Sequence, residues 1–327
     1  MEAFRFTRAG DVSQAIQLGQ GQGTRFIAGG TTLLDLMKLD VERPNRLVDI
    51  NRLPLAAIEK TPDGGLKIGT LVRNSDLAHA PEVQQAYGVL SQALLSGASA
   101  QLRNMATTGG NLLQRTRCLY FRNDAMPCNK REPGSGCAAI DGENRTLAIF
   151  GTSKDCIATN PSDMNVALTA LEAVIQIQGA NGERNVPIGD FFLVPGTTPQ
   201  RENILEAGDL VTHIMLPPPR KASRQLYLKL RDRASYQFAL ASAAIVVELN
   251  GDHVSYVRVV MGGVGTKPWR SHEAEKVLLG QKADGRIFER AAEAALHGAA
   301  PQSQNGFKVE LARRCVAHAL TLATQQV

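Results

Sequence analysis

The chain has no apolar run approaching the ~20 residues that a membrane-spanning helix needs, so we do not expect a membrane protein. Residues 1–6 carry an acid at position two and no apolar segment, so we expect no secretory signal peptide. Any export would need the signal of a partner. Internal repeats and low-complexity tracts are also missing, which excludes solenoid and disordered classes.

The composition is that of a globular protein. Of 327 residues, 43% are hydrophobic and 20% are charged, and the length suggests roughly two domains. The net charge is +5, but the basic residues are interleaved with acids, which favours a mildly basic solvated surface over a nucleic-acid interface. The densest basic stretches are residues 220–233 and 115–131. The second of these overlaps a group of cysteines and would favour an anionic cofactor or a metal–thiolate site.

The first two thirds of the chain mixes short strands and helices. Hydrophobic periodicity predicts strands at 25–28, 46–50 and 65–69. It predicts helices at 32–39, 83–96 and 162–172, and a further helix starts at 74–77. After residue 172, strand patterns dominate to residue 216. Residues 115–158 show neither period and are predicted to be irregular.

Three consecutive prolines at 217–219 mark the clearest domain boundary, because they continue neither a helix nor an internal strand. We expect domains at 1–217 and 222–327. The second contains three strand patterns followed by three helical ones, which indicates an α+β fold. The strands are predicted at 225–230, 238–249 and 254–264, and the helices at 271–279, 286–296 and 306–323.

Two glycine-rich turns are candidates for binding an anion. The first, Ala28-Gly29-Gly30-Thr31-Thr32, separates a strand from a helix, and the second is Thr107-Thr108-Gly109-Gly110-Asn111. Glycines allow close approach to the backbone, and successive amide N–H groups with a helix N-terminus attract phosphate. A tight turn capped by threonine is the alternative for either loop alone. Neither turn reads G-x-G-x-x-G, which disfavours a Rossmann site.

A third polar turn, Asn160-Pro161-Ser162-Asp163, places a carboxylate where it could accept a ribose hydroxyl or cap a helix. Together with Tyr227-Leu228-Lys229, the three turns resemble, in order and spacing, the FAD-binding subunits of the xanthine dehydrogenase and carbon monoxide dehydrogenase family of molybdenum hydroxylases. The resemblance covers essentially the whole chain. It implies a two-subdomain FAD-binding (PCMH-type) domain, with subdomains of about 1–57 and 58–217, followed by a three-stranded antiparallel sheet with three helices.

The resemblance also implies which residues hold FAD. The pyrophosphate would be wrapped by the first turn and completed by the second, Asp163 would hold ribose, and Val211 and Lys229 would lie near the isoalloxazine ring. By local sequence alone, a lysine on a strand is more often a solvated charge. The implied FAD-binding residues are Arg25, Phe26, Ile27, Ala28, Gly29, Gly30, Thr31, Thr32, Leu33, Thr107, Gly110, Asn111, Asp163, Val211 and Lys229.

Four cysteines, Cys118, Cys128, Cys137 and Cys156, fall in an irregular insert of about 115–158, whereas Cys315 shares a helical face with apolar residues and is expected in the core. Nine, eight and eighteen residues separate the four. This spacing allows two disulfides, a zinc site, an iron–sulfur cluster or unrelated thiols. The insert contains no histidine, which disfavours mixed Cys/His zinc ligation. The expected lack of a signal peptide disfavours disulfides.

The insert resembles the one in the flavin subunits of periplasmic aldehyde oxidoreductases, in the run Cys128-Asn129-Lys130-Arg131-Glu132-Pro133-Gly134-Ser135-Gly136-Cys137 between Cys118 and Cys156. This resemblance implies a [4Fe-4S] cluster on the four cysteines. We expect Arg115, Arg117, Lys130 and Arg131 to offset the negative charge of such a cluster.

The function implied is that of an electron-transfer subunit. A large partner would carry the molybdenum cofactor and oxidise an aldehyde, a small partner with [2Fe-2S] clusters would pass electrons to FAD here, and FAD would deliver them to an external acceptor. No residue is assigned as a catalytic acid or base. The complex would reach the periplasm by co-export with a signal-bearing partner, or else stay in the cytoplasm. The alternatives are a free-standing flavin-dependent oxidoreductase and a structural zinc-binding module.

Overall fold

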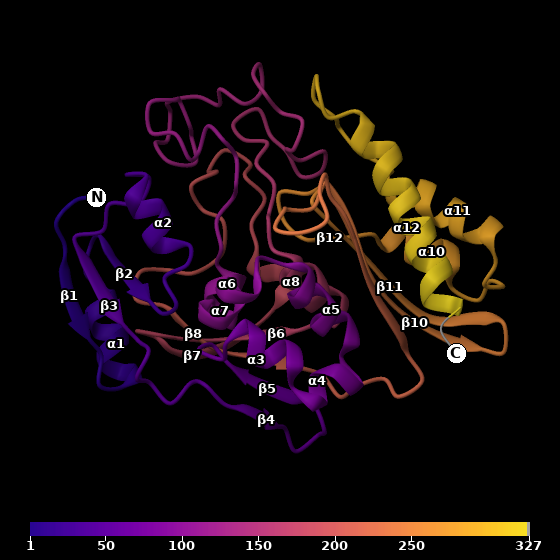
Figure 1. The fold of residues 1–327 in the computed structure, drawn as a ribbon, viewed down its shortest axis with the longest axis horizontal. Coiled ribbons are helices and arrows are strands. Elements are labelled where there is room, and N and C mark those ends of the chain that lie inside the picture. Colours follow the sequence, from indigo (N-terminus) through magenta and orange to yellow (C-terminus); the bar gives the residue numbers. More distant parts are fainter. Residues whose placement is uncertain (326–327) are drawn as a thin grey trace.

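Three β-sheets organise the computed structural model, which describes residues 1–325 (Figure 1). Helices pack against each sheet, and each sheet with its helices forms one of three units, which are connected by loops. Within the described residues, every helix is too short or too polar to cross a bilayer.

The N-terminal unit is a small parallel sheet with the strand order β1-β3-β2. Its elements are β1 (Arg5–Arg8), α1 (Val12–Gly19), β2 (Thr24–Ile27), α2 (Leu33–Lys38) and β3 (Arg46–Asp49). Parallel neighbours need a crossover connection, and α2 supplies it between β2 and β3. The predicted strand–turn–helix–strand unit is confirmed. The first glycine-rich turn lies where β2 ends and α2 begins.

The second unit is a five-stranded antiparallel sheet in the order β4-β5-β8-β6-β7, covered by helices. The central strand β8 pairs on both sides, so most of its residues are buried. The strands are β4 (Ile58–Lys60), β5 (Leu66–Gly69), β6 (Val174–Gly179), β7 (Gly182–Pro187) and β8 (Leu210–Leu216). The helices are α3 (Asn74–His79), α4 (Pro81–Ala86), α5 (Gly88–Ser96), α6 (Ala100–Met105), α7 (Thr108–Leu112), α8 (Asp163–Ala170) and α9 (Ile188–Phe191).

The single helix predicted at 83–96 is wrong in one respect, because the structure divides this segment into α4 and α5 at Tyr87. Tyr87 leaves the helical conformation with φ −133° and ψ 46°. Its buried side chain reaches across the unit, and its hydroxyl donates to the carbonyl oxygen of Pro217 at 2.7 Å. This contact joins residues 130 positions apart, which local periodicity does not reveal.

The C-terminal unit is an antiparallel sheet in the order β12-β11-β10-β9 with three helices. The elements are β9 (Arg224–Leu230), β10 (Ala241–Asn250), β11 (His253–Gly262), β12 (Trp269–Arg270), α10 (His272–Leu278), α11 (Gly285–Ala295) and α12 (Phe307–Gln325). The three predicted strands and three helices are all present, and the two-residue β12 is an addition. Residues 217–219 lie between β8 and β9.

This sheet is buried on both faces. Alternate residues of β10 belong to different cores: Ala243 and Ile245 pack with α10 to α12, whereas Ala244 and Val246 pack with α5 and α8. Figure 1 shows α10 to α12 on the far side of β10 and β11 from α5 and α8. Because successive side chains of a strand point to opposite faces, β10 packs against the helices of the C-terminal unit on one face and against the second unit on the other.

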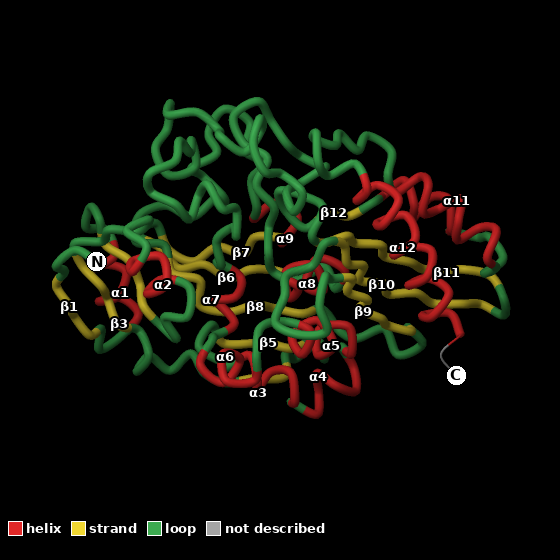
Figure 2. The backbone as a smooth tube through the Cα atoms, turned by 45° about the horizontal axis from the view of Figure 1, so that its top comes forward, coloured by secondary structure: helices red, strands yellow, loops and turns green. Residues whose placement is uncertain are grey.

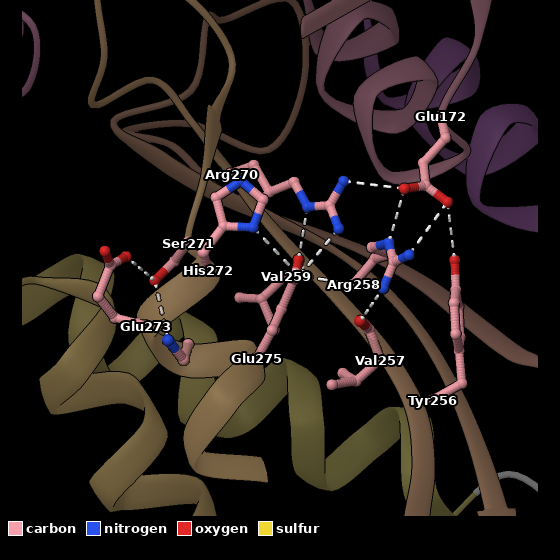
Figure 3. Close-up of polar contacts among 11 residues, drawn as sticks. Glu172, Tyr256, Val257, Arg258, Val259, Arg270, Ser271, His272, Glu273 and Glu275 are labelled. Carbon is pink, nitrogen blue, oxygen red and sulfur yellow. Dashed lines mark hydrogen bonds and ion pairs between the residues drawn. The ribbon is translucent and has the colours of Figure 1, made fainter. Parts of the chain in front are cut away.

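A charged cluster at this junction is shown in Figure 3. Glu172, which follows α8 and has φ +55°, lies between two arginines of the C-terminal sheet. Its Oε1 is 3.0 Å from Arg258 Nε and 2.9 Å from Arg270 Nη1. Glu275 on α10 completes the pairing of Arg270 at 2.9 Å. The two arginines hold the pKa of Glu172 below its usual range even though burial alone raises it.

The insert of 115–158 contains no helix or named strand, as predicted (Figure 2). Its apolar residues form a small core around Phe121 that also includes Leu36 and Val41 of the N-terminal unit. The final part of the insert contacts the C-terminal unit. The ammonium of Lys308, a fully buried residue near the start of α12, donates to the carbonyl oxygens of Thr146 at 3.0 Å, Leu147 at 2.9 Å and Gly263 at 2.6 Å. Lys308 thus joins the insert to the end of β11.

Lys308 gives stability a pH dependence. Burial lowers its pKa from 10.5 to about 7, so the unfolded chain holds this proton more tightly than the folded one. The free energy of unfolding is therefore expected to rise with pH between pH 7 and 10.5. One proton gives a slope of at most about 1.4 kcal/mol per pH unit. The slope is expected to be smaller than this limit, because the three carbonyl oxygens favour the charged form of Lys308 and oppose the effect of burial. Urea unfolding at several pH values in this window measures the slope. Lys308→Met should lose it, whereas Lys282→Met, at an exposed lysine, should keep it. An equal slope in all three proteins would contradict the assignment.

Candidate flavin site and cysteine cavity

The first glycine-rich turn presents unpaired backbone donors. Gly30 lies in the left-handed region with φ +72°. A Cβ atom at Gly29 would overlap the carbonyl oxygen of Met105, so only glycine lets this turn lie against the segment that precedes the second turn. Within the described part of the chain, no acceptor pairs with the backbone N–H groups of Gly29, Gly30, Thr31 and Thr32. Successive free amides next to a helix start suit a phosphate group.

Gly29→Ala is expected to weaken FAD binding at least tenfold, or about 1.4 kcal/mol. The added methyl group would push the first turn away from Met105 and displace the free amides. Fluorescence titration of the apoprotein with FAD measures the change. Gly189→Ala is a matched control, because a Cβ atom there meets nothing within 4 Å. Equal affinity in both variants would show that the close approach of the two turns does not shape the site.

The second turn is ordered by its own hydroxyl groups. Thr107 precedes α7, and its Oγ1 accepts the N–H of Gly110 at 3.2 Å. The capping role considered from the sequence is therefore present. Asn111 faces the third turn, where its Oδ1 accepts the hydroxyl of Ser162 at 2.8 Å. The first, second and third turns thus form one continuous region of the structure.

Asp163 lies at the centre of a buried polar group. The hydroxyl of Tyr227 donates to its Oδ1 at 2.6 Å, and the ammonium of Lys229 donates to its Oδ2 at 2.7 Å. The Lys229 side chain is only 4% exposed and also donates to the carbonyl oxygen of Ser96. Burial, with the neighbouring carboxylate, raises the pKa of Tyr227 well above its ordinary value.

Two local expectations for this group are wrong. Lys229 is a buried ion-pair partner and not a solvated charge on a strand. The cap of α8 is Ser162, whose Oγ accepts the N–H of Asn165 at 3.1 Å, so Asp163 is free to pair with β9. Tyr227 belongs to the Tyr227-Leu228-Lys229 motif, but the sequence suggested no function for its side chain. Its position two residues before Lys229 places both side chains on one face of a strand, which is the signal that could have identified it.

The other predicted residues lie in three settings. Arg25 pairs with Glu42, its Nε lying 3.3 Å from Oε2. Phe26 packs into the core of the N-terminal unit, and Leu33 begins α2. Val211 is buried on β8 in the same core as Leu112, the residue after Asn111. The structure therefore brings the turns, Asp163 and Lys229 together, and Val211 belongs to the core that also holds Leu112.

All four insert cysteines line one small cavity. Cys128 and Cys137 are opposite each other in an isolated antiparallel bridge, and no disulfide joins any of the five cysteines. Backbone N–H groups point at the sulfurs, including that of Ala158 at 3.5 Å from Cys156 Sγ. Burial raises the pKa of Cys118 to about 11 and also raises those of Cys137 and Cys156. The expected core position of Cys315 is confirmed.

The four thiols are not arranged around a single ion. Tetrahedral zinc with Zn–S bonds of about 2.3 Å needs sulfurs about 3.8 Å apart. Within residues 1–325, no three cysteine, histidine or acidic side chains are grouped closely enough to hold a single metal ion. The four thiols that line the cavity are therefore spread more widely than the ligands of one zinc ion.

The basic residues of the insert have different tasks from those predicted. Arg115 pairs with Glu42 and Glu202, and Arg117 pairs with Asp35 at 3.3 Å. Arg131 donates to backbone carbonyls, including that of Phe121 at 2.9 Å. Of the four predicted residues, Lys130 alone lines the cysteine cavity. Acids from distant segments pair with Arg115 and Arg117, and backbone carbonyls hold Arg131, so the expectation for these three residues needs correcting.

A larger cavity of about 260 Å³ connects the two regions. It lies between the insert, the third turn and residues 237–242. Cys118 lines it from the insert and Asp163 from the flavin side. The cysteine cavity and the candidate flavin site are thus neighbours separated by one open space.

Comparisons with known proteins agree with this geometry. Residues 2–219 match the model of the FAD binding domain in molybdopterin dehydrogenase, and residues 226–325 match that of the CO dehydrogenase flavoprotein C-terminal domain. The chain is 48% identical to the aldehyde oxidoreductase FAD-binding subunit PaoB of Escherichia coli, over 100% of both chains. It is 31% identical to the glyceraldehyde dehydrogenase medium chain of Sulfolobus acidocaldarius, over 85% of this chain and 82% of that one.

A solved structure of carbon monoxide dehydrogenase from Hydrogenophaga pseudoflava superposes with a TM-score of 0.78 and 27% identity, covering 99% of this chain and 98% of that one. The α+β fold with its C-terminal sheet-and-helix domain is therefore that of a known group. With both family models accounting for nearly its whole length, the chain belongs to the FAD-binding subunits of the molybdenum hydroxylase family of oxidoreductases.

Proposed function

We propose that this chain is the FAD- and [4Fe-4S]-binding electron-transfer subunit of a heterotrimeric molybdenum-dependent aldehyde oxidoreductase. Its partners would be a large subunit with the molybdenum cofactor and a small subunit with [2Fe-2S] clusters. Electrons from the small subunit would reach FAD and leave to an external acceptor. The flavin, when bound, supplies the redox chemistry, and the chain supplies binding and orientation.

One observation carries the cluster assignment: Cys118, Cys128, Cys137 and Cys156 line a single buried cavity with amide donors directed at the sulfurs. The convergence of four thiols from a segment without regular structure supports a shared ligand in that cavity. The adjoining space lined by Cys118 and Asp163 supports electron exchange with a flavin bound near Asp163. Full-length identity of 48% to an aldehyde oxidoreductase subunit supports the aldehyde class.

For FAD, we propose the two glycine-rich turns as the pyrophosphate site and Asp163 as the ribose ligand, with Val211 and Lys229 near the ring. The free amides of the first turn and the Asn111–Ser162 contact support this placement. Because Asp163 already accepts from Tyr227 and Lys229, a ribose hydroxyl would share a carboxylate that these residues orient.

Chemical analysis of the complex purified through a tag on this chain tests the proposal. Two partner chains, molybdenum, one FAD, and iron in excess of that held by the small partner are expected. The chain purified alone should bind FAD and about four irons and should not turn over aldehyde. Zinc in place of iron would support the structural-zinc alternative, and aldehyde turnover by the chain alone would support a free-standing flavoenzyme.

For location, we propose the periplasm, reached by co-export with a signal-bearing partner; a cytoplasmic complex is the alternative. Fractionation of cells that express all three subunits distinguishes these outcomes, and deletion of the partner's signal should retain this chain in the cytoplasm.

A further inference from the structure

Glu202 links two cations beside the cysteine cavity. It comes from the segment between α9 and β8, outside the insert, and is fixed there because its carbonyl oxygen accepts the N–H of Leu193 at 3.1 Å. Its Oε2 lies 2.6 Å from Arg115 Nε, and its Oε1 lies 3.0 Å from Lys130 Nζ. Although burial alone raises it, the pKa of Glu202 is lowered by these two cations, so the carboxylate is ionised.

Lys130 brings one of these charges to the sulfurs. Its side chain is 9% exposed and lines the cavity together with all four cysteines. Besides Glu202, its ammonium donates to the carbonyl oxygen of Pro199 at 2.9 Å, which fixes its position. Asp155 is the other charged residue lining this cavity.

Reduction of an iron–sulfur cluster adds one negative charge to a site that four thiolates already make anionic. A fixed positive charge nearby stabilises the reduced state and raises the reduction potential, and a fixed negative charge does the opposite. The effect is greater where solvent is limited, and the side chains of Lys130 and Glu202 are 9% and 26% exposed.

We propose that Lys130 and Glu202 are a positioning pair that sets the reduction potential of the cluster with opposite signs: Lys130 raises it and Glu202 lowers it. Arg115 holds the carboxylate in place. This inference rests on the cluster assignment of the proposed function and adds the residues that tune it.

A redox titration of the purified complex, followed by the electron paramagnetic resonance signal of the reduced cluster, tests the pair. Lys130→Met should shift the midpoint potential downward, and Glu202→Gln should shift it upward. Lys130→Arg retains the charge and should keep the wild-type value. Glu206→Gln is the matched control, because Glu206 lies on the same segment in an exposed pair with Arg201, and it should also leave the potential unchanged.

The possible results distinguish the cluster assignment from the tuning of its potential by Lys130 and Glu202. If the wild-type protein holds no iron at the four cysteines, the proposed function of the insert and this inference both fail. If the iron is present and Glu202→Gln leaves the potential unchanged, or moves it in the same direction as Lys130→Met, the inference alone is overturned. If Lys130→Met does not assemble its cluster, Glu202→Gln against Glu206→Gln decides the result.

Discussion

Replacing Cys128 by serine is expected to abolish binding of the proposed iron–sulfur cluster and to open the insert to proteolysis. The cavity draws one thiol from each of four separate positions in a segment without helices, so the cluster and the order of the segment depend on each other. Iron analysis and the absorption spectrum measure the first effect. Limited proteolysis, with the cleavage sites mapped to residues 115–158, measures the second.

Cys315→Ala is the matched control for this prediction. Cys315 is buried, as Cys128 is, but it lies on α12 in the C-terminal core. We expect this variant to keep its iron and an uncleaved insert while losing some stability, because a small core side chain is truncated. Both variants should retain FAD, whose proposed turns lie outside the insert. Full iron content in Cys128→Ser would contradict the assignment of that ligand.

Asp163→Ala should destabilise the chain by about 3–5 kcal/mol, because it leaves the ammonium of Lys229 buried without its carboxylate. The side chains of Lys229 and Asp163 are only 4% and 8% exposed, so bulk solvent compensates little for the lost partner. Tyr227 would also lose the acceptor of its hydroxyl at 2.6 Å. Urea unfolding of the apoprotein measures the change independently of FAD.

Two further variants test the cause of this loss. Asp232→Ala removes a carboxylate from an exposed pair with Arg145 and is expected to cost less than about 1 kcal/mol. Lys229→Met in the Asp163→Ala background removes the unpaired charge and should recover part of the stability. A loss in Asp163→Ala no greater than in Asp232→Ala would show that the pair is accessible to water.

The secondary structure was predictable because it follows local patterns. The alternation along β10 and β11 and the helical period of α10 to α12 are visible in the sequence, and the turn residues mark the ends of β2 and α2. The break at Tyr87 was not predictable, because its reason is a hydrogen bond to Pro217 in another part of the chain. Helical periodicity carries no information about such a contact.

The candidate site was predictable as a set of motifs but not as a set of partners. The glycines of the two turns indicate that another group approaches the backbone closely. That Gly29 lies against the carbonyl oxygen of Met105 can be known only from the folded structure. The burial of Lys229 depends on Asp163, 66 residues away, and the tasks of Arg115 and Arg117 depend on acids at positions 35, 42 and 202. The sequence shows the sign of each charge, but only the fold shows which residue it pairs with.

The contacts of Lys308 also set an order of events during synthesis. Lys308 and its neighbour Asn305 hold residues 146–148 from positions 157 to 162 residues further along the chain. The four insert cysteines leave the ribosome well before this lysine does, so the contacts that hold residues 146–148 cannot form until the last helix begins to emerge. We therefore expect iron to be inserted into a finished chain and not into a nascent one, and a protein truncated before α12 to keep its four thiols without a fixed place to hold them.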